Sequence, residues 1–147
     1  KIAVSLSDPF VVAAFGDALR EVMGGGVDLI FCNKDEAMAF TGTDTLEAAA
    51  KSLKQCAKTF AITDGANGAI SFDGNTVNQS KGVTATAIDT NGAGDMFAGA
   101  FLYAITSGRG YAWAADLAND CAARVVARFG PRLDSSDFDN IKSKFGI

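Results

Sequence analysis

Apolar segments of two different periods alternate along this chain, and this alternation limits its possible folds more than any other feature. Short apolar runs typical of buried strands are separated by longer segments in which apolar residues recur at helical spacing. The expected strands are residues 1–6, 27–32, 60–63, 69–72, 76–79 and 83–88, and the expected helices are residues 9–23, 34–41, 46–57, 97–104, 111–129 and 135 onward. Strands joined by helices predict an α/β fold with a mostly parallel sheet flanked by helices.

Residues with special backbone preferences mark the ends of these elements. Asp8 followed by Pro9 is typical of a helix start, with the aspartate as N-cap and the proline at the first helical position. Three glycines, residues 24–26, end that helix, and Gly130 followed by Pro131 ends a long alanine-rich one. The turn at residues 73–75 predicts a hairpin between the two strands on either side of it.

Composition excludes several classes of function. The chain has 147 residues, a net charge of −4 and no histidine. The acidic balance argues against a nucleic-acid partner, because no basic patch stands out to bind a phosphate backbone. Without histidine there is no imidazole base, no histidine metal ligand and no Ser-His-Asp triad. Any proton acceptor is therefore expected to be a carboxylate.

The cysteines and the apolar runs bear on the location of the protein. Cys32, Cys56 and Cys121 are an odd number without close spacing, which favours a reducing, cytoplasmic location over a disulfide framework. No apolar run reaches the ~18 residues of a membrane span, and no signal peptide opens the chain. Because residues 1–6 already have the pattern of a core strand, we expect the chain to be part of a longer protein whose upstream half is missing.

The segment from Ile88 to Phe97 is the most unusual in the chain. A predicted strand ends, a glycine-rich turn follows, and a helix begins. At a helix N-terminus, the backbone N–H groups of Gly92, Ala93 and Gly94 would face outward beside the positive end of the helix dipole, which suits a phosphate or another oxyanion. The segment lacks the third glycine of a dinucleotide-binding turn and the Gly-Lys-Ser/Thr of a P-loop.

Asp95 sits beside this expected anion site, where its charge would repel a ligand. The placement is explained if Asp95 accepts a proton from a hydroxyl group that attacks a bound phosphoryl group. The alternative is that Asp95 merely complements the helix dipole and that the glycines only form a turn.

Two further segments also end predicted strands. Asn33 followed by Glu36 is close to a capping box, and the alternative is that both residues reach the waters of a magnesium ion and a phosphate. Thr63, Gly65 and Gly68 form another glycine-rich turn. Ligands of open α/β sheets bind beyond the carboxyl ends of strands, which favours a shared site. Arg124 and Arg128, four residues apart, are interpreted as a solvated stripe, with phosphate contact as the alternative.

With these residues in place, the sequence resembles the C-terminal half of a PfkB (ribokinase-type) carbohydrate kinase. Residues 89–95 match the D-T-x-G-A-G-D signature of that family, and Asn33-x-x-Glu36 matches its N-x-x-E motif. Thr63-x-Gly65-x-x-Gly68 resembles the nucleotide-phosphate turn of the family. Residues 5–10 and the exact form of residues 89–95 are most similar to its adenosine-kinase branch. The resemblance implies a ribokinase-like α/β fold and a transferase activity, the transfer of a phosphoryl group from ATP to a primary hydroxyl group of a nucleoside or sugar.

The resemblance also implies a role for each matching residue. Asp95 would be the catalytic base, and Gly92, Ala93 and Gly94 would form the anion hole for the γ-phosphoryl group. Asn33 and Glu36 would organise Mg²⁺ and ATP. Other residues would line the nucleotide or a monovalent cation: Thr63, Gly65, Gly68 and Asn119 the nucleotide, and Asp89 and Asn91 a cation such as K⁺.

One departure from the family limits what this chain can do. The residues of the family that grip the sugar, and the β-sheet lid over it, come mainly from an N-terminal half whose Gly-Gly signature is absent here. The chain is therefore expected to bind nucleotide weakly and to turn over little by itself. The alternatives are a ribokinase or fructokinase type of sugar kinase and a nucleotide-binding domain without catalysis. None of these features indicates the acceptor or the oligomeric state.

Overall fold

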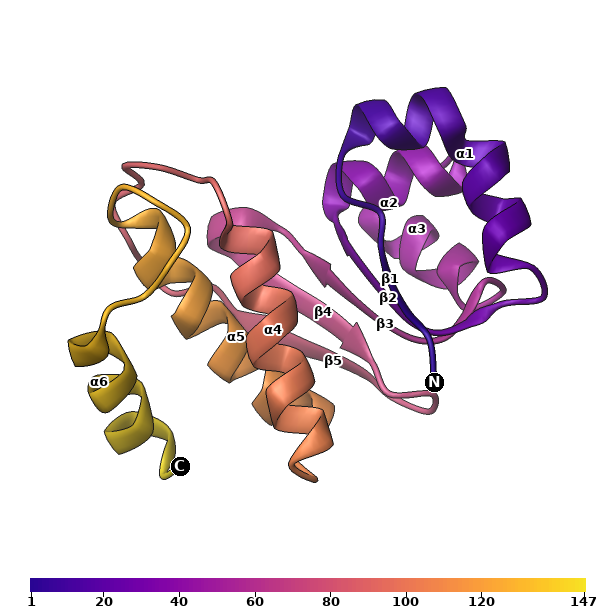
Figure 1. Cartoon of the computed structure of the whole chain (residues 1–147). Helices are drawn as coiled ribbons and strands as arrows, with labels where there is room; N and C mark the ends of the chain where they lie inside the picture. The colour runs from indigo at the N-terminus through magenta and orange to yellow at the C-terminus, as the bar shows by residue number, and fades with distance from the viewer. The chain divides into compact units, whose positions relative to one another are not determined.

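The computed structural model describes all residues, 1–147, and divides the chain into two compact units. Unit 1 comprises Lys1–Asp64 and Ile70–Val77, and unit 2 comprises Gly65–Ala69 and Asn78–Ile147. The strands form one five-stranded sheet in the order β1-β2-β3-β4-β5. Their bounds are Ala3–Ser5 (β1), Val27–Asn33 (β2), Ala57–Thr63 (β3), Gly68–Phe72 (β4) and Val77–Lys81 (β5). Figure 1 labels the five strands. Strands β1, β2 and β3 are parallel, so the predicted α/β class is confirmed.

Unit 1 packs three helices against its parallel strands. They are α1 (Pro9–Met23), α2 (Lys34–Thr41) and α3 (Leu46–Leu53). Alternate residues of the strands, such as Ile30 and Phe60, share a core with Phe40 of α2 and Leu53 of α3. Phe31, one position along β2 and therefore on the other face, is buried as well. Burial on both faces explains the continuous apolar runs of these strands.

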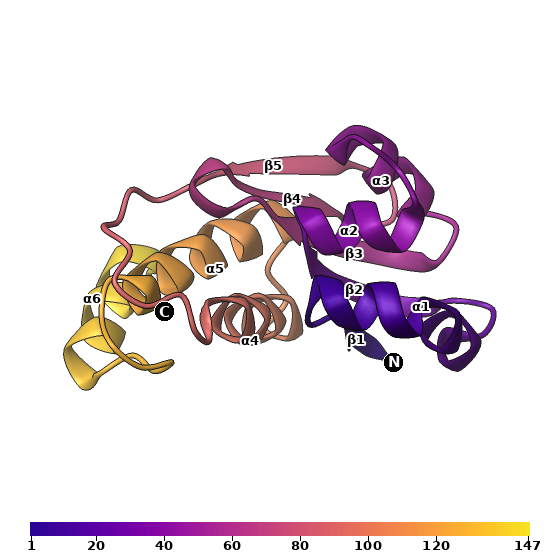
Figure 2. The same cartoon turned by 90° about the horizontal axis from the view of Figure 1, so that it is seen from above.

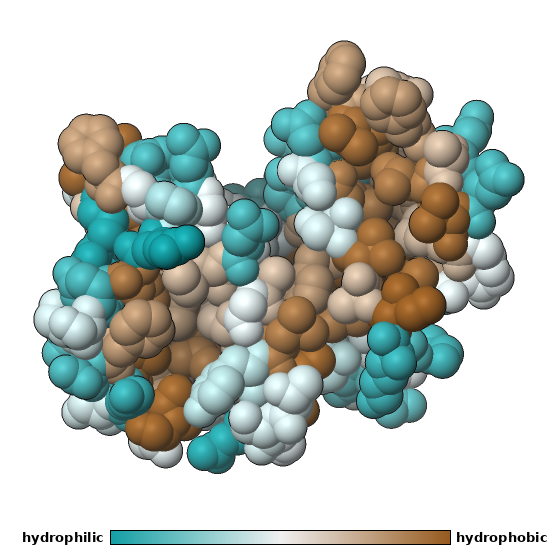
Figure 3. All heavy atoms as spheres, in the orientation of Figure 1, coloured by the Kyte–Doolittle hydropathy of each residue, from teal (hydrophilic) through white to brown (hydrophobic).

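The ends of the helices in unit 1 follow the predicted signals. The Asp8 carboxylate accepts the N–H of Phe10 at 2.6 Å, and Pro9 occupies the first position of α1. Thr45 caps α3 by accepting the N–H of Ala48. Helix α1 leaves Phe10, Phe15 and Val22 exposed, and hydrophobic side chains gather over it at the upper right of Figure 3.

Unit 2 contains a short 3-10 helix, η1 (Gly65–Asn67), and three α-helices. The helices are α4 (Ala93–Thr106), α5 (Tyr111–Val126) and α6 (Ser135–Phe145). Figure 2 shows α4 and α5 side by side, and Phe97 and Phe101 of α4 are buried. The Phe101 ring also meets Tyr111 edge to face at 5.1 Å between centroids. None of the helices combines the length and apolar character that crossing a membrane requires.

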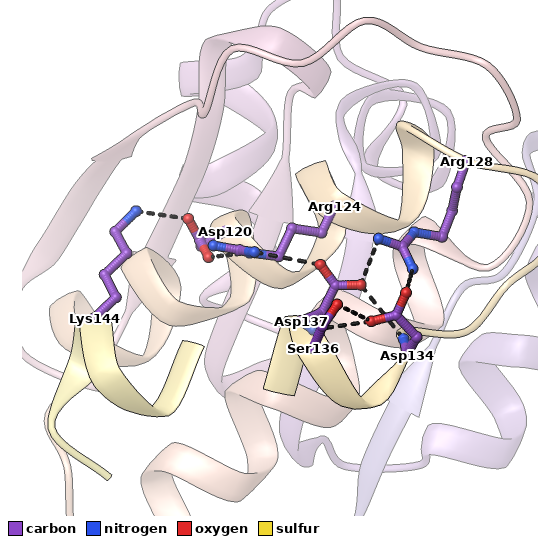
Figure 4. A network of polar contacts seen from close by, with 7 residues as sticks. All are labelled: Asp120, Arg124, Arg128, Asp134, Ser136, Asp137 and Lys144. Atoms are coloured by element: carbon purple, nitrogen blue, oxygen red, sulfur yellow. Dashed lines mark hydrogen bonds and ion pairs between the residues drawn. The ribbon is translucent and has the colours of Figure 1, made fainter. Parts of the chain in front are cut away.

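A network of charged side chains joins α5 to α6 (Figure 4). The buried Asp120 carboxylate accepts hydrogen bonds from Nε of Arg124 at 2.8 Å and from Nζ of Lys144 at 2.6 Å. Arg124 also reaches the buried Asp137 at 3.3 Å, and Arg128 pairs with the same carboxylate. The interpretation of Arg124 and Arg128 as a solvated stripe is wrong, because both guanidinium groups are partly covered and paired with aspartates from α5, α6 and the segment between them.

Several of the predicted strand and helix boundaries are also wrong, and α5 ends at Val126 instead of Phe129. Residues 83–88 form no strand. Their side chains are exposed, and the N–H of Ile88 donates to the Val126 carbonyl after α5 instead of to a neighbouring strand. Residues 1–6 form only the short, largely exposed β1. Helix α3 ends at Leu53, since residues 54–56 form a turn and Ala57 already belongs to β3. The hairpin of β4 and β5 around Asp73 is confirmed, with Asp73 accepting the N–H groups of Asn75 and Thr76.

We expect the α5–α6 network to make unfolding depend on pH. Burial, the largest influence, raises the pKa of Asp120, but the hydrogen bonds and charges of Lys144 and Arg124 together bring that pKa below 3.8. A lowered pKa in the folded state contributes stability above the ordinary value, and this stability is lost as pH falls through the folded value. Asp120→Asn should therefore lower the free energy of unfolding at pH 7 by about 2 kcal/mol. Its deficit should shrink below pH 4 in urea titrations.

The matched control is Asp139→Asn, which neutralises an exposed aspartate on α6 outside the network. It should leave the free energy of unfolding within about 0.5 kcal/mol of that of the unchanged chain, both at pH 7 and below pH 4. An Asp120→Asn deficit that stays constant from pH 7 to pH 3 would show that lost packing, and not the charge, is responsible.

Candidate functional site

The glycine-rich turn stands at the N-terminus of α4, as predicted. Gly92 is the N-cap, and no side chain caps the helix. The first helical bond runs from Met96 N–H to the Gly92 carbonyl at 2.9 Å. The N–H of Ala93 donates to Thr90 at 3.3 Å, whereas those of Gly94 and Asp95 have no backbone acceptor. Ala93 is therefore less available to an anion than the sequence predicts, and the amide of Asp95 is more available.

Asp95 occupies the first turn of α4, and its side chain is exposed. A carboxylate buried in the apolar interior could not reach a ligand, so this exposure keeps the proposed role of Asp95 open. Its oxygens take part in no ion pair or side-chain hydrogen bond of the chain. The residue thus combines a free carboxylate with the backbone amides of a helix N-terminus, where an oxyanion is stabilised.

A close contact with Pro131 holds the turn in place. Gly92 has a φ of 77°, and a Cβ atom there would collide with the Cβ and Cα atoms of Pro131. Glycine is therefore required twice, for its backbone conformation and for its lack of a side chain. The Asp89 carboxylate also links the turn to the loop that contains Pro131, because it accepts the N–H of Asn91 at 3.0 Å and that of Gly130 at 3.1 Å. These two hydrogen bonds lower the pKa of Asp89.

Asn33 and Glu36 form a complete capping box at the start of α2. The Glu36 carboxylate accepts the backbone N–H of Asn33 at 2.9 Å and its side-chain Nδ2 at 2.7 Å. In return, Asn33 Oδ1 accepts the N–H of Glu36 at 2.8 Å. Burial raises the pKa of Glu36. The capping interpretation is confirmed, whereas the predicted contact with magnesium and phosphate stays a prediction.

The turn after β3 is shaped by a close approach of two backbones. Thr63 ends β3 and is half-buried, and Gly65 opens η1 with a φ of 54°. Gly68 is buried, and a Cβ on it would collide with the backbone of Ser80 and Gly82. A Cβ on Gly82 would in turn collide with Ala66. Packing alone accounts for glycine at position 68, so its proposed contact with nucleotide remains a prediction.

Asn119 lies inside unit 2 and joins α5 to the end of β5. Its Nδ2 donates to Ser80 Oγ at 2.8 Å and to the Lys81 carbonyl at 3.2 Å. Ser80 in turn donates to Asp116 at 2.5 Å. The predicted role of Asn119 beside an adenine or ribose thus competes with a bracing role that the structure displays.

The sequence does not reveal the residues that support the two glycine-containing turns, Pro131 at the N-terminus of α4 and Ser80 and Gly82 at the turn after β3. Pro131 was expected only to end a helix, and Gly82 and Ser80 were given no role. Their importance comes from contacts between segments that lie far apart along the chain. The one signal in the sequence is the Gly130-Pro131 pair, because proline fixes its own φ and restricts the residue before it.

A groove of about 490 Å³ begins at Asp95 and runs between α4, α5 and α6. Its lining is mostly apolar, and the charged or hydroxyl-bearing side chains in it are Asp95, Tyr103 and Lys142. Gly99 and Ala100 form part of its wall on α4, and a Cβ at Gly99 would meet no atom within 4 Å. The groove can receive an apolar group, but it offers few partners to a molecule with many hydroxyl groups.

The donor set fits magnesium only as an ion that arrives bound to phosphate. No group of three or more cysteine, aspartate and glutamate side chains is placed to hold a metal ion. Magnesium keeps several waters and takes one or two protein carboxylates when phosphates supply its other ligands. The predicted K⁺ ligands fit less well, since both Asp89 oxygens already accept backbone N–H groups and Gly130 offers that carboxylate a donor.

We expect Gly92→Ala to distort the turn. The added methyl group would have to displace Pro131 while the backbone keeps a φ that alanine rarely adopts, so the free energy of unfolding should fall by about 2 kcal/mol. Gly94→Ala is the matched control, because a Cβ there meets nothing within 4 Å. Urea unfolding measures both. Equal stability of the two variants would contradict a close Gly92–Pro131 contact.

Comparison with known proteins places this chain in a family. The family model of the pfkB family carbohydrate kinases matches residues 1–137. Adenosine kinase of Saccharomyces cerevisiae is 31% identical over 145 residues, covering 90% of this chain and 42% of that protein. The crystal structure of a probable sugar kinase from Rhizobium etli superposes with a TM-score of 0.92 at 32% identity, covering 100% of this chain and 45% of that one.

Adenosine kinase from Sinorhizobium meliloti superposes with a TM-score of 0.90 at 32% identity, covering 97% of this chain and 44% of that one. The chain thus spans less than half the length of each of these relatives. The fold is ribokinase-like, as the resemblance implied. On the family match over residues 1–137, the chain belongs to the PfkB family of carbohydrate kinases.

Proposed function

We propose that this chain supplies the catalytic base and the phosphate-binding turn of an ATP-dependent phosphotransferase. The acceptor would be a primary hydroxyl group of a nucleoside or sugar, with adenosine as the first candidate. The observation that carries the proposal is the exposed Asp95 in the first turn of α4, beside amides that have no backbone acceptor. In a domain that only bound nucleotide, a carboxylate at this position would repel phosphate, which favours proton transfer over a role in the helix dipole alone.

In the proposed reaction, Asp95 takes the proton of the acceptor hydroxyl group. The hydroxyl oxygen bonds to the γ-phosphorus of ATP, the bond from that phosphorus to the β–γ bridging oxygen breaks, and ADP leaves. The N–H groups of Gly92, Gly94 and Asp95 donate to the transferred phosphoryl oxygens, with Ala93 contributing if its bond to Thr90 opens. Magnesium bound to ATP would neutralise phosphate charge, and Asn33 and Glu36 would orient its waters.

Acceptor recognition is the part that this chain supplies least. The groove beside Asp95 is apolar apart from a few side chains, whereas a sugar needs several hydrogen-bond partners. We therefore propose that the chain corresponds to the C-terminal portion of a ribokinase-like kinase, without the lid, and that it phosphorylates acceptors slowly by itself. A sugar kinase of the ribokinase or fructokinase type is the alternative. The three free cysteines are in keeping with the cytoplasm as the proposed location.

Asp95→Asn tests the base. The experiment uses a chimera in which residues 1–147 replace the matching segment of the Sinorhizobium meliloti adenosine kinase, so that the rest of a related enzyme is present. An amide keeps the shape of the carboxylate but cannot accept the proton. We expect kcat to fall by about 10³-fold or more while KM for ATP changes little, measured by a coupled assay of ADP release.

Asp139→Asn, which removes an exposed carboxylate from α6, should leave kcat unchanged in the same chimera. Comparing adenosine, ribose and fructose as acceptors tests the substrate class at the same time. Turnover that survives Asp95→Asn would refute the assignment of the base whatever the acceptor.

Glu36→Gln separates the capping role from the magnesium role. The amide retains the shape of the capping box but loses an acceptor for the N–H donors of Asn33, so stability should fall by about 1 kcal/mol. If Glu36 also orients magnesium, KM for ATP should rise several-fold at limiting Mg²⁺ and recover at excess Mg²⁺. Glu47→Gln, in the first turn of α3, is the control. Loss of stability with an unchanged Mg²⁺ titration would assign Glu36 to capping alone.

A further inference from the structure

The loop between α5 and α6, residues 127–134, touches the glycine turn at two points. Gly130 donates its N–H to Asp89, and Pro131 packs against Gly92 so closely that a Cβ on Gly92 would collide with it. Just before the loop, the Val126 carbonyl accepts the N–H groups of Ile88 and Asp89 at 2.7 and 3.2 Å. The position of the turn therefore depends on the position of this loop.

The loop has no regular secondary structure of its own, so other contacts must hold its shape. Arg128 near its beginning pairs with Asp134 at its end, with 2.8 Å between Nη1 and Oδ2 (Figure 4). The second guanidinium nitrogen pairs with Asp137 in the first turn of α6, with 2.5 Å between Nη2 and Oδ2. These two ion pairs close the loop like a clasp, and we call Arg128, Asp134 and Asp137 the clasp.

Burial of its carboxylate makes the Arg128–Asp137 pair of the clasp more than an exposed surface contact, whereas Asp134 is itself exposed. Asp137 is 5% exposed, and the Nε atom of Arg128 is buried without a hydrogen-bond partner. Asp137 is also held by Arg124, and Asp134 caps α6 by accepting the N–H of Asp137 at 3.0 Å. Removing the Arg128 charge would leave a buried carboxylate with one cation fewer, and such groups are costly to leave unpaired.

We propose that Arg128 is a positioning residue for the glycine turn and that it acts through the clasp. Its ion-pair partners are Asp134 and Asp137, not a residue of the turn, and its effect passes through Gly130 and Pro131. With the clasp closed, the loop presses on Gly92 and fixes the backbone from which the amides of Gly94 and Asp95 project. The consequence for phosphoryl transfer rests on the proposed function, whereas the coupling between clasp and turn does not.

The test compares two arginines of the same loop. Arg128→Gln opens the clasp, and Arg132→Gln removes an equal charge from an exposed residue outside it. Amide hydrogen exchange of the 147-residue chain is followed by NMR at Gly130, whose N–H binds Asp89, and at Met96, whose N–H binds Gly92. We expect exchange at both amides to quicken about tenfold in Arg128→Gln and to stay unchanged in Arg132→Gln.

Asp134→Asn serves as the second variant, because it keeps an oxygen that can cap α6 and removes only one ion pair of the clasp. It should quicken exchange at Gly130 and Met96 by a smaller factor, and it allows the test if Arg128→Gln does not fold. Exchange that quickens within α6 but not at these two amides, in whichever variants fold, would overturn the proposal.

The kinase chimera supplies an independent readout. If the proposed function holds, Arg128→Gln should lower kcat more than it raises KM for the acceptor, because the turn serves the transferred phosphoryl group. Arg128→Lys, which keeps the charge without the two-pronged geometry, should recover part of the loss. If the chimera is inactive with every residue intact, the proposed function fails, and the exchange experiment still decides whether the clasp positions the turn.

Discussion

The absence of a side chain at Gly92 is the constraint on which the candidate site depends. The N-terminus of α4 can meet the loop after α5 only because Pro131 occupies the space that a Cβ would take. The Asp89 carboxylate bonds to both sides of this contact, through Asn91 and Gly130. The turn is thus held by packing and hydrogen bonds before any ligand arrives, which is the preorganisation that electrostatic stabilisation of a transition state requires.

The pair Asn33 and Glu36 satisfies a structural demand and keeps hydrogen-bonding capacity for the role that we propose. All three oxygens of the two side chains accept hydrogen bonds within the capping box. A carboxylate oxygen has more than one lone pair, so the box leaves room for a further donor such as a metal-bound water. Burial raises the pKa of Glu36 and so disfavours its charged form, whereas a nearby cation would stabilise that form.

Local signals in the sequence predicted the parts of the structure that depend on neighbouring residues. Asp8 with Pro9, Asn33 with Glu36 and the turn at Asp73 all act within a few positions, and the structure has each of them as expected. Residues 83–88 looked like a strand because of composition alone, but a strand needs a partner along its edge. Arg128 looked solvated for a related reason, since its aspartate partners come from the next loop and helix. Contacts between distant segments were beyond what spacing could predict.

One side of α4 packs in the interior, and another side lines the groove. Phe97, Phe101 and Ala104 are buried, whereas Asp95 and Gly99, four residues apart, share the side that lines the groove. The carboxylate therefore stands at the end of an apolar surface with few hydrogen-bond partners. The groove therefore offers little basis for distinguishing one polyol from another, because discrimination between sugars rests on hydrogen bonds to their hydroxyl groups. In the function that we propose, catalytic chemistry and acceptor choice would thus belong to different parts of the kinase.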